Sequence, residues 1–181
     1  MSQKKEILLT TAERLFYQNG FHAIGIKRIV SESGIAMMTL YNHFASKEDL
    51  ILAVLSRRES RYLTYLLRQL EQGAKEGHVL RRLCRAHALW LEQQEQRGCM
   101  FLRAREEYGG DPGHMIVLAV DQHKQALSKW IQQLDADLSE AQTLQAMLLM
   151  EGATALAETA GSHKVGEQLE RMANLLFPIG D

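Results

Sequence analysis

Proline is nearly absent from this chain of 181 residues, which holds only Pro112 and Pro178. Its scarcity leaves room for long helices, because proline interrupts them. Cysteine is equally scarce: Cys84 and Cys99 are too few for a disulfide framework, which favours a reducing compartment. The N-terminus lacks the apolar core of a signal peptide, and no window approaches the roughly 18 unbroken apolar residues of a membrane span. We therefore expect a cytoplasmic protein that contacts no membrane.

A strong excess of either charge is also missing, since the net charge is −1. The distribution is uneven, however. Residues 1–47 carry six basic and three acidic side chains, an excess of three positive charges, while the remainder of the chain is acidic. A mildly basic head on an acidic body is typical of a protein that contacts nucleic acid with one end only.

Apolar residues recur with a period near 3.6, and no stretch alternates with the period of 2 that a strand requires. We read Gly20 as a residue that ends the first helix, since glycine adopts positive φ readily. The pattern predicts an all-α protein. The expected helices span residues 3–19, 26–33, 37–43, 47–72, 78–95, 112–133, 139–160 and 165–177.

Residues 26–44 predict a helix-turn-helix, because two short helices are separated by a tight turn that contains Gly34. Leu40 and Phe44 lie four residues apart and should pack against the apolar side chains Phe16, Ile29 and Val30. The other side chains of residues 37–43 then point outward. Hydroxyl, amide and imidazole groups on such a face suit phosphates and base edges.

This stretch resembles the N-terminal motif of the tetracycline-repressor (TetR) family of bacterial regulators. The resemblance covers about residues 7–55. Its matching residues are Phe16, Gly20-Phe21, Ile29, Gly34-Ile35, Thr39-Leu40-Tyr41, His43-Phe44 and Ser46-Lys47-Glu48-Asp49-Leu50. It implies about nine helices, with a three-helix DNA-binding head at 1–48 and a helical effector-binding and dimerisation body at 49–181. It also implies a homodimer that binds double-stranded DNA, with recognition helices roughly 34–36 Å apart.

The resemblance assigns a role to each residue of the outward face. Phosphate contacts are expected from Thr39, Tyr41, His43 and Lys47. Contacts to base edges or the groove floor are expected from Lys27, Met37, Met38 and Asn42.

Three positions depart from the family pattern. Ala36 stands where a hydroxyl usually caps the recognition helix, a loss of about 1 kcal/mol of helix stability. Ile24-Gly25 replaces a Thr and Ser pair at the entry to the second helix. Met37-Met38 replaces polar or small residues and offers apolar contact to thymine methyl groups.

The body is expected to hold a small-molecule effector. Methionines and aromatic residues suit an adaptable pocket, although most of them serve equally well as ordinary core. The candidate lining residues are His87, Trp90, Met100, Phe101, Tyr108, Met115, His123, Trp130 and Met147. Residues 98–101 are expected to form a break between two helices that contributes to the pocket wall.

The helices near 139–160 and 165–177 are the predicted dimer interface. The first is rich in small and apolar residues around most of its circumference, and Leu169, Met172, Ala173, Leu176 and Phe177 give the second an apolar stripe. Two such helices from each subunit would make a four-helix bundle. A core within one chain is the alternative.

The sequence thus predicts a ligand-responsive DNA-binding transcriptional regulator, a repressor released from a palindromic operator by its effector. One alternative is a DNA-bound interaction protein whose body recruits another protein. Another is an all-helical enzyme or metal-binding module, which equal activity after removal of residues 1–50 would favour. Neither an enzyme nor a metal or cofactor site is expected, since no catalytic motif and no ligand spacing emerges. The operator, the effector, the regulated genes, the sign of regulation and any redox role of the two cysteines stay open.

Overall fold

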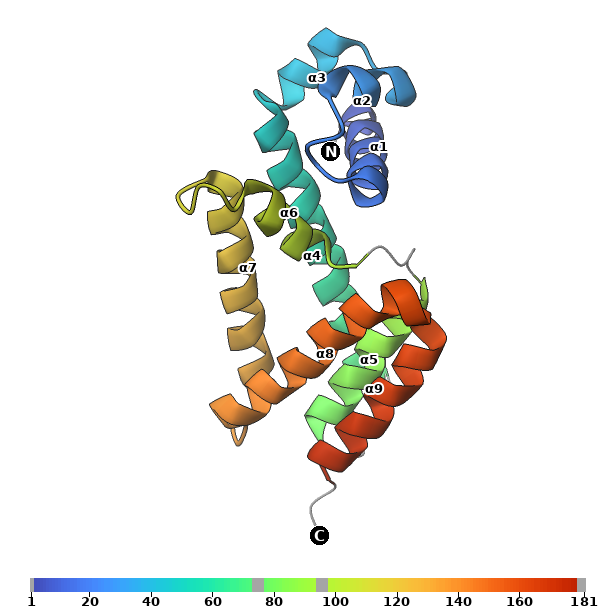
Figure 1. Ribbon diagram of the computed structural model, residues 1–181, viewed down its shortest axis with the longest axis vertical. Helices are drawn as coiled ribbons and strands as arrows, with labels where there is room; N and C mark the ends of the chain where they lie inside the picture. The colour runs from blue at the N-terminus through green and yellow to red at the C-terminus, as the bar shows by residue number, and fades with distance from the viewer. Residues whose placement is uncertain (1, 73–76, 94–97, 179–181) are drawn as a thin grey trace. The chain divides into compact units, whose positions relative to one another are not determined.

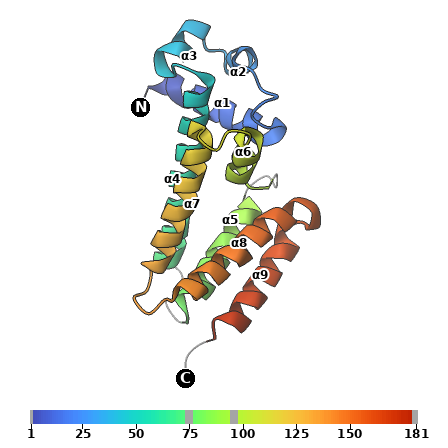
Figure 2. The same ribbon diagram turned by 60° about the vertical axis from the view of Figure 1, so that its left-hand side comes forward.

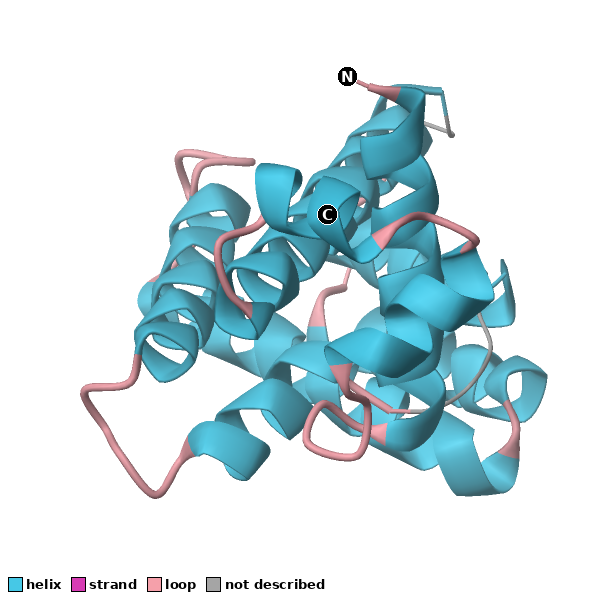
Figure 3. Cartoon of the chain, turned by 90° about the horizontal axis from the view of Figure 1, so that it is seen from above, coloured by secondary structure: helices cyan, strands magenta, loops and turns pink. Residues whose placement is uncertain are grey.

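The computed structural model describes residues 2–72, 77–93 and 98–178. Within those ranges the chain is entirely helix and loop, without a strand, which confirms the all-α prediction (Figures 1 and 3). The helices are α1 (Gln3–Asn19), α2 (Ile26–Ser33), α3 (Met37–His43), α4 (Lys47–Gln72), α5 (Val79–Gln93), α6 (Met100–Tyr108), α7 (Met115–Gln132), α8 (Glu140–Ala160) and α9 (Ser162–Leu176). No helix in the described ranges has the length and apolar character needed to cross a membrane.

Two details of the helical prediction were wrong. Met100 and Phe101 are not a break, because they begin helix α6. Helix α7 starts at Met115, three residues later than expected, because Asp111 organises a turn in front of it. Its Oδ1 accepts the Gly113 N–H at 2.9 Å, and its carbonyl accepts the His114 N–H at 3.0 Å. Such side-chain-to-backbone bonds compete with helix formation.

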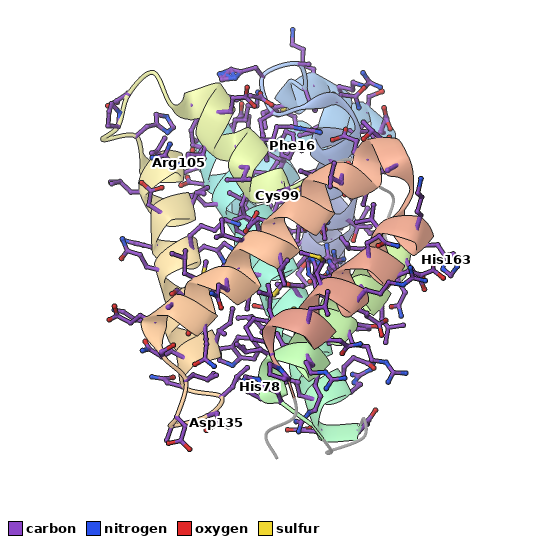
Figure 4. The ribbon with its side chains drawn as sticks, turned by 60° about the horizontal axis from the view of Figure 1, so that its bottom comes forward. Phe16, His78, Cys99, Arg105, Asp135 and His163 are labelled. Atoms are coloured by element: carbon purple, nitrogen blue, oxygen red, sulfur yellow. The ribbon has the colours of Figure 1, made fainter. Side chains whose placement is uncertain are left out.

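The chain divides into two compact units, which are described separately. Unit 1 combines residues 1–59 with residues 100–122, so it holds α1–α3, the first half of α4, α6 and the start of α7. Its interior is closed by fully buried side chains, among them Phe16, Phe21 and Leu50. Arg105, labelled in Figure 4, donates to Asp121 at 2.7 Å and so ties α6 to α7.

Unit 2 combines residues 60–99 with residues 123–181, and α5, α8 and α9 lie side by side in it (Figure 2). At Gly166 a Cβ would lie 3.3 Å from the Cβ of Ala88, so α9 approaches α5 closely there. Across the outer surface His163, labelled in Figure 4, lies 2.9 Å from the carboxylate of Glu92. Ser139 and Gln142 form a reciprocal capping box at the start of α8.

Candidate nucleic-acid interface

The turn between α2 and α3 is held by local hydrogen bonds. Gly34 ends α2 in the left-handed conformation with φ 68° and ψ 12°, which a side chain would strain. Its N–H donates to the Val30 carbonyl at 3.1 Å. The Ser33 hydroxyl donates to the same carbonyl at 3.2 Å and accepts the Ile35 N–H at 3.3 Å. These bonds set the direction in which α3 leaves the turn.

The inner face of α3 closes the core of the helix-turn-helix as predicted. Leu40 is fully buried and Phe44 is 4% exposed, while Phe16 and Ile29 are fully buried beneath them. Val30 is only half-buried. Because the apolar side of α3 is used up in this packing, its other side faces outward.

The outer face carries the residues that we predict to contact DNA. Met38 is 72% exposed and Tyr41 49% exposed, which is unusual for large apolar side chains. Lys27 and Asn42 are also exposed, whereas Met37, Thr39, His43 and Lys47 are half-buried. All eight lie on α2, α3 or the first turn of α4, within unit 1. Their contacts with DNA stay a prediction.

Ion pairing distinguishes the basic residues of this region. Arg14 and Arg28 both bind Glu32, at 2.5 and 3.0 Å. The hydrogen bonds from Arg14 and then Arg28 lower the pKa of the Glu32 carboxyl. Arg14 therefore fastens α1 to α2, whereas Arg28 pairs with Glu32 within α2, one helical turn away. Lys27 has no ion pair among the described residues, so its charge is available to a phosphate or a base edge.

Lys47 begins α4 beside a capping serine. The Ser46 hydroxyl accepts the Asp49 N–H at 3.0 Å. Burial lowers the pKa of Lys47, against the opposing influence of Glu48 and Glu107. A cation at a helix N-terminus is unfavourable. Glu48 and Glu107 offset part of that cost in the free chain, and a DNA phosphate would add a further anion.

The two departures at helix starts have structural consequences. Ala36 and Gly25 occupy the N-cap positions of α3 and α2, and neither helix has a side-chain cap hydrogen bond. The recognition helix thus starts with amide groups that only water or a ligand can satisfy.

The proposed effector residues are distributed over both units. His87, Trp90, His123, Trp130 and Met147 belong to unit 2, where His87 and His123 are buried and the others half-buried. Met100, Phe101, Tyr108 and Met115 belong to unit 1, where Met115 is 45% exposed. A common pocket for the nine residues stays a prediction.

His87 is the centre of a buried hydrogen-bond network in unit 2. Its Nε2 lies 3.0 Å from the Met150 carbonyl, so this nitrogen carries the hydrogen. Nδ1 then accepts the Tyr62 hydroxyl at 2.8 Å. Nε2 also lies 3.0 Å from the Thr154 hydroxyl, which itself donates to the Met150 carbonyl.

Burial determines the ionisation of this network. Desolvation lowers the pKa of His87 to about 4, so the ring is neutral near pH 7. Tyr62 and Thr154 were not predicted as partners of His87. A tyrosine on an apolar helix face was the only sign of this contact.

The two cysteines differ in environment. Cys84 is fully buried, and burial raises its thiol pKa to about 12, which suits a packing residue. Cys99 is half-buried, with its Sγ 3.9 Å from the Lys124 ammonium, which also pairs with Glu151. In the described part of the chain, no group of three or more His, Cys, Asp or Glu side chains could hold a metal ion.

Comparison with known proteins agrees with the helix-turn-helix geometry of α2 and α3. Residues 8–54 match the sequence model of the family described as bacterial regulatory proteins, tetR family. The transcriptional activator FasR of Mycolicibacterium smegmatis is 30% identical over 94 residues, which are 52% of this chain and 43% of FasR. The transcriptional repressor NemR of Escherichia coli is 31% identical over 94 residues, which are 52% of this chain and 46% of NemR.

A solved structure extends the likeness along the chain. A TetR-family transcriptional regulator from Streptomyces coelicolor superposes with a TM-score of 0.84 at 29% identity, over 96% of this chain and 93% of that one. The curated relatives, by contrast, are matched over less than half of their own length. Sequence motif, helix-turn-helix geometry and fold agree: residues 8–54 carry the helix-turn-helix of the tetR family of bacterial regulatory proteins, and the chain has the fold of a TetR-family transcriptional regulator.

Proposed function

We propose that the chain is a homodimeric repressor that leaves a palindromic operator when a small-molecule effector binds its body. The observation that carries the proposal is the outer face of α3, where Met38 and Tyr41 are exposed above a closed core. A short helix that presents large side chains to solvent is suited to insertion into a major groove. In this proposal residues 1–48 bind DNA, and residues 49–181 bind effector and dimerise.

Dimerisation is supported by exposed apolar residues on α8 and α9. On α8, Leu144, Leu148 and Leu156 recur at multiples of four residues and are 58%, 65% and 58% exposed. On α9, Leu175 is 78% exposed, beside Met172 and Leu176. The two helices pack against one another, so these residues can form one surface for a second copy. This is the interface predicted at 139–160 and 165–177.

Effector binding is supported by the polar groups inside unit 2. The Tyr62, His87 and Thr154 network lies in an otherwise apolar core, and the Trp90 ring lies 5.3 Å from the Tyr62 ring. A few fixed hydrogen-bonding groups among apolar and aromatic side chains are typical of small-molecule sites.

A second candidate function is a DNA-bound interaction protein whose body recruits another protein. It is favoured by apolar side chains outside the proposed dimer helices. Leu102, Met115 and Leu118, on α6 and α7, are each between 45% and 48% exposed. A protein partner would cover them, whereas a small effector would leave them in water.

DNA binding can be tested through the salt dependence of affinity. The duplex used would be one that the wild-type chain selects from a random-sequence pool. Lys47→Ala removes one cation from each of two heads, so the slope of log affinity against log salt should become shallower by about 2. Tyr41→Phe removes a neutral phosphate donor, so it should weaken binding without changing the slope.

Lys129→Ala is the matched control, because it removes an exposed lysine of α7 that lies outside both the helix-turn-helix and the proposed dimer helices. The phosphate role of Lys47 is wrong if Lys47→Ala behaves like this control. Failure to select any duplex would contradict DNA binding itself. Effector response is tested by screening metabolites for thermal stabilisation and then measuring duplex affinity at saturation, where unchanged affinity would contradict the repressor mechanism.

The sign of regulation needs a separate measurement, because the relatives include both an activator and a repressor. A reporter gene placed behind the selected duplex should be transcribed less when the chain is present. Increased transcription would make the chain an activator.

A further inference from the structure

We infer that Glu107 is the positioning residue that makes α6 move together with the DNA-binding helices and so couples the body to the recognition helix. The inference rests on the proposed function, and it concerns contacts within unit 1. Helix α6 is separated from α3 by more than fifty residues of sequence, yet it groups with α1–α3 in this unit.

The Glu107 carboxylate binds two consecutive backbone amides of the loop between α1 and α2. Oε1 accepts the Phe21 N–H at 2.9 Å, and Oε2 accepts the His22 N–H at 2.6 Å. The His22 ring adds a third contact, with its Nδ1 3.1 Å from Oε2. Both carboxylate oxygens are therefore committed to this loop, through charge-assisted hydrogen bonds of the stronger kind.

Gly20 makes this contact possible. Its φ of 85° turns the chain at the end of α1, and a Cβ there would lie 2.7 Å from Glu107 Oε1. A side chain at position 20 would strain the backbone and push the carboxylate away. The absence of a side chain at Gly20 thus leaves the space that the Glu107 carboxylate occupies.

Arg103 provides a second link on the same face of α6, one helical turn before Glu107. Its Nη1 donates to the Tyr17 carbonyl at 2.8 Å. This carbonyl is in the last turn of α1, where backbone acceptors lack partners within the helix. Arg103 binds a carbonyl in the last turn of α1 and Glu107 binds two amides of the loop that follows, so α6 is fastened to this region by groups of both polarities.

A stack of three rings extends the contact to the start of α7. The His22 ring stacks on Tyr108 at 4.5 Å between centroids, and Tyr108 stacks on His114 at 4.7 Å. His114 directly precedes Met115, the first residue of α7. Helix α7 is continuous from unit 1 into unit 2, because its residues from 123 onward belong to the latter. A displacement of α7 therefore has a mechanical path to the loop before α2.

The same carboxylate also acts on the proposed DNA contact. Glu107 is one of the two acidic groups that favour the charged form of Lys47. Changes at Glu107 can therefore alter DNA affinity directly, so affinity alone is a poor measure of coupling. The coupling free energy between two sites is reciprocal. If a change in the body alters DNA affinity, DNA binding must alter the body by the same free energy.

The experiment is amide hydrogen exchange of the full chain with and without the duplex selected by the wild type. In the wild type, the duplex should slow exchange both in α3 and in α8 of unit 2. In Glu107→Gln, the Phe21 and His22 amides should exchange at least about tenfold faster, since a charged acceptor is lost. The duplex should still protect α3, but its effect on α8 should disappear.

Three control variants separate coupling from general damage. Glu106→Gln makes the same change of charge one residue earlier, at an exposed position, and should transmit like the wild type. Gly20→Ala disrupts the same contact by adding a methyl group on the loop side, and it should have the same effect as Glu107→Gln. It also provides a test if Glu107→Gln does not fold. Gly77→Ala imposes a similar backbone strain, at φ 89°, at an exposed position outside α8, and should leave transmission intact.

The outcomes are distinct. If Glu107→Gln and Gly20→Ala transmit the effect of the duplex to α8 as the wild type does, Glu107 has no coupling role. A wild-type chain that binds duplex without any change in α8 also overturns the inference, while the proposed DNA binding stands. A wild-type chain that binds no duplex overturns the proposed function itself.

Discussion

His87 shows how one buried residue combines packing with a defined proton state. His87 is 5% exposed, and its two ring nitrogens have partners on α4 and α8. Since the Met150 carbonyl can only accept and the Tyr62 hydroxyl can donate, the neutral ring satisfies the network completely. Protonation would make Nδ1–H a second donor facing the Tyr62 hydroxyl hydrogen, and the hydrogen bond between them would be lost unless the hydroxyl rotated.

The stability of the chain should therefore depend on pH through His87. The ordinary histidine pKa of 6.5 is lowered to about 4 in the folded chain. Between these values the unfolded chain binds the proton and the folded chain does not, so stability falls as pH falls. The loss from this one group should reach about 3 kcal/mol near pH 4, at 1.36 kcal/mol per pKa unit.

Urea unfolding of the wild type and His87→Gln at several pH values measures this dependence. The glutamine variant should show a flatter curve between pH 6.5 and 4, whatever its stability at pH 7. His163→Gln, which changes an exposed ring, should keep the wild-type slope in that range. Parallel curves for the wild type and His87→Gln would contradict the role of His87.

The sequence could nominate His87 but not its partners. Tyr62 and Thr154 lie 25 and 67 residues away from it, and no local pattern links positions so distant. The same holds for Glu107, which lies 85 and 86 residues from the amides that it binds. An acidic residue on a short helix is ordinarily solvated, and only the folded chain shows which backbone amides face it.

At the scale of elements, α3 combines good burial with a weak start. Leu40 and Phe44 hold it to the core, but Ala36 leaves its first amides without a side-chain acceptor. The backbone of Ala36, with φ −63° and ψ 143°, already has the extended conformation of an N-cap residue. A hydroxyl added at this position therefore needs no rearrangement of the chain.

Ala36→Ser should stabilise the chain by about 1 kcal/mol, because its hydroxyl can accept an N–H from the first turn of α3. The free energy of unfolding in urea measures the gain. Ala45→Ser adds the same hydroxyl at an exposed position next to Ser46, which already caps α4, so it should have little effect. Equal effects of the two substitutions would show that capping is not what limits α3.

Periodicity predicted the long helices well because each buries a continuous apolar stripe. It missed α6 because nine residues offer too few turns for a stripe, and because Gly98 and Gly109 on either side suggested a loop. The start of α7 was misplaced for a different reason. A turn built by the Asp111 side chain depends on local hydrogen bonds, which hydrophobic spacing does not report.

At the scale of the whole molecule, function is predicted to depend on a second copy. One head offers a single short recognition helix, and a palindromic site is read by two. The leucines of α8 are exposed in the single chain, so a charge placed there can be solvated in the monomer but not in the dimer. Leu148, which is 65% exposed, is the most exposed of these leucines.

Leu148→Glu should raise the dissociation constant of the dimer at least about hundredfold. An unpaired charge buried in the interface costs more than about 2.8 kcal/mol, and each 1.4 kcal/mol changes the dissociation constant tenfold. Sedimentation velocity measures the change, and circular dichroism should show an unchanged helix content. Leu67→Glu, at a leucine of α4 that is 40% exposed, is the matched control and should stay dimeric.

The same variant should alter DNA binding in a way that connects the interface to the heads. In the proposed function a monomer would place one Lys47 on DNA where the dimer would place two, so the salt slope of Leu148→Glu should be about half that of the wild type. Adding Lys47→Ala to it should then change the slope by about 1 and not by about 2. A dimeric Leu148→Glu, or a monomer with the full wild-type slope, would show that α8 and α9 do not bring the two heads together.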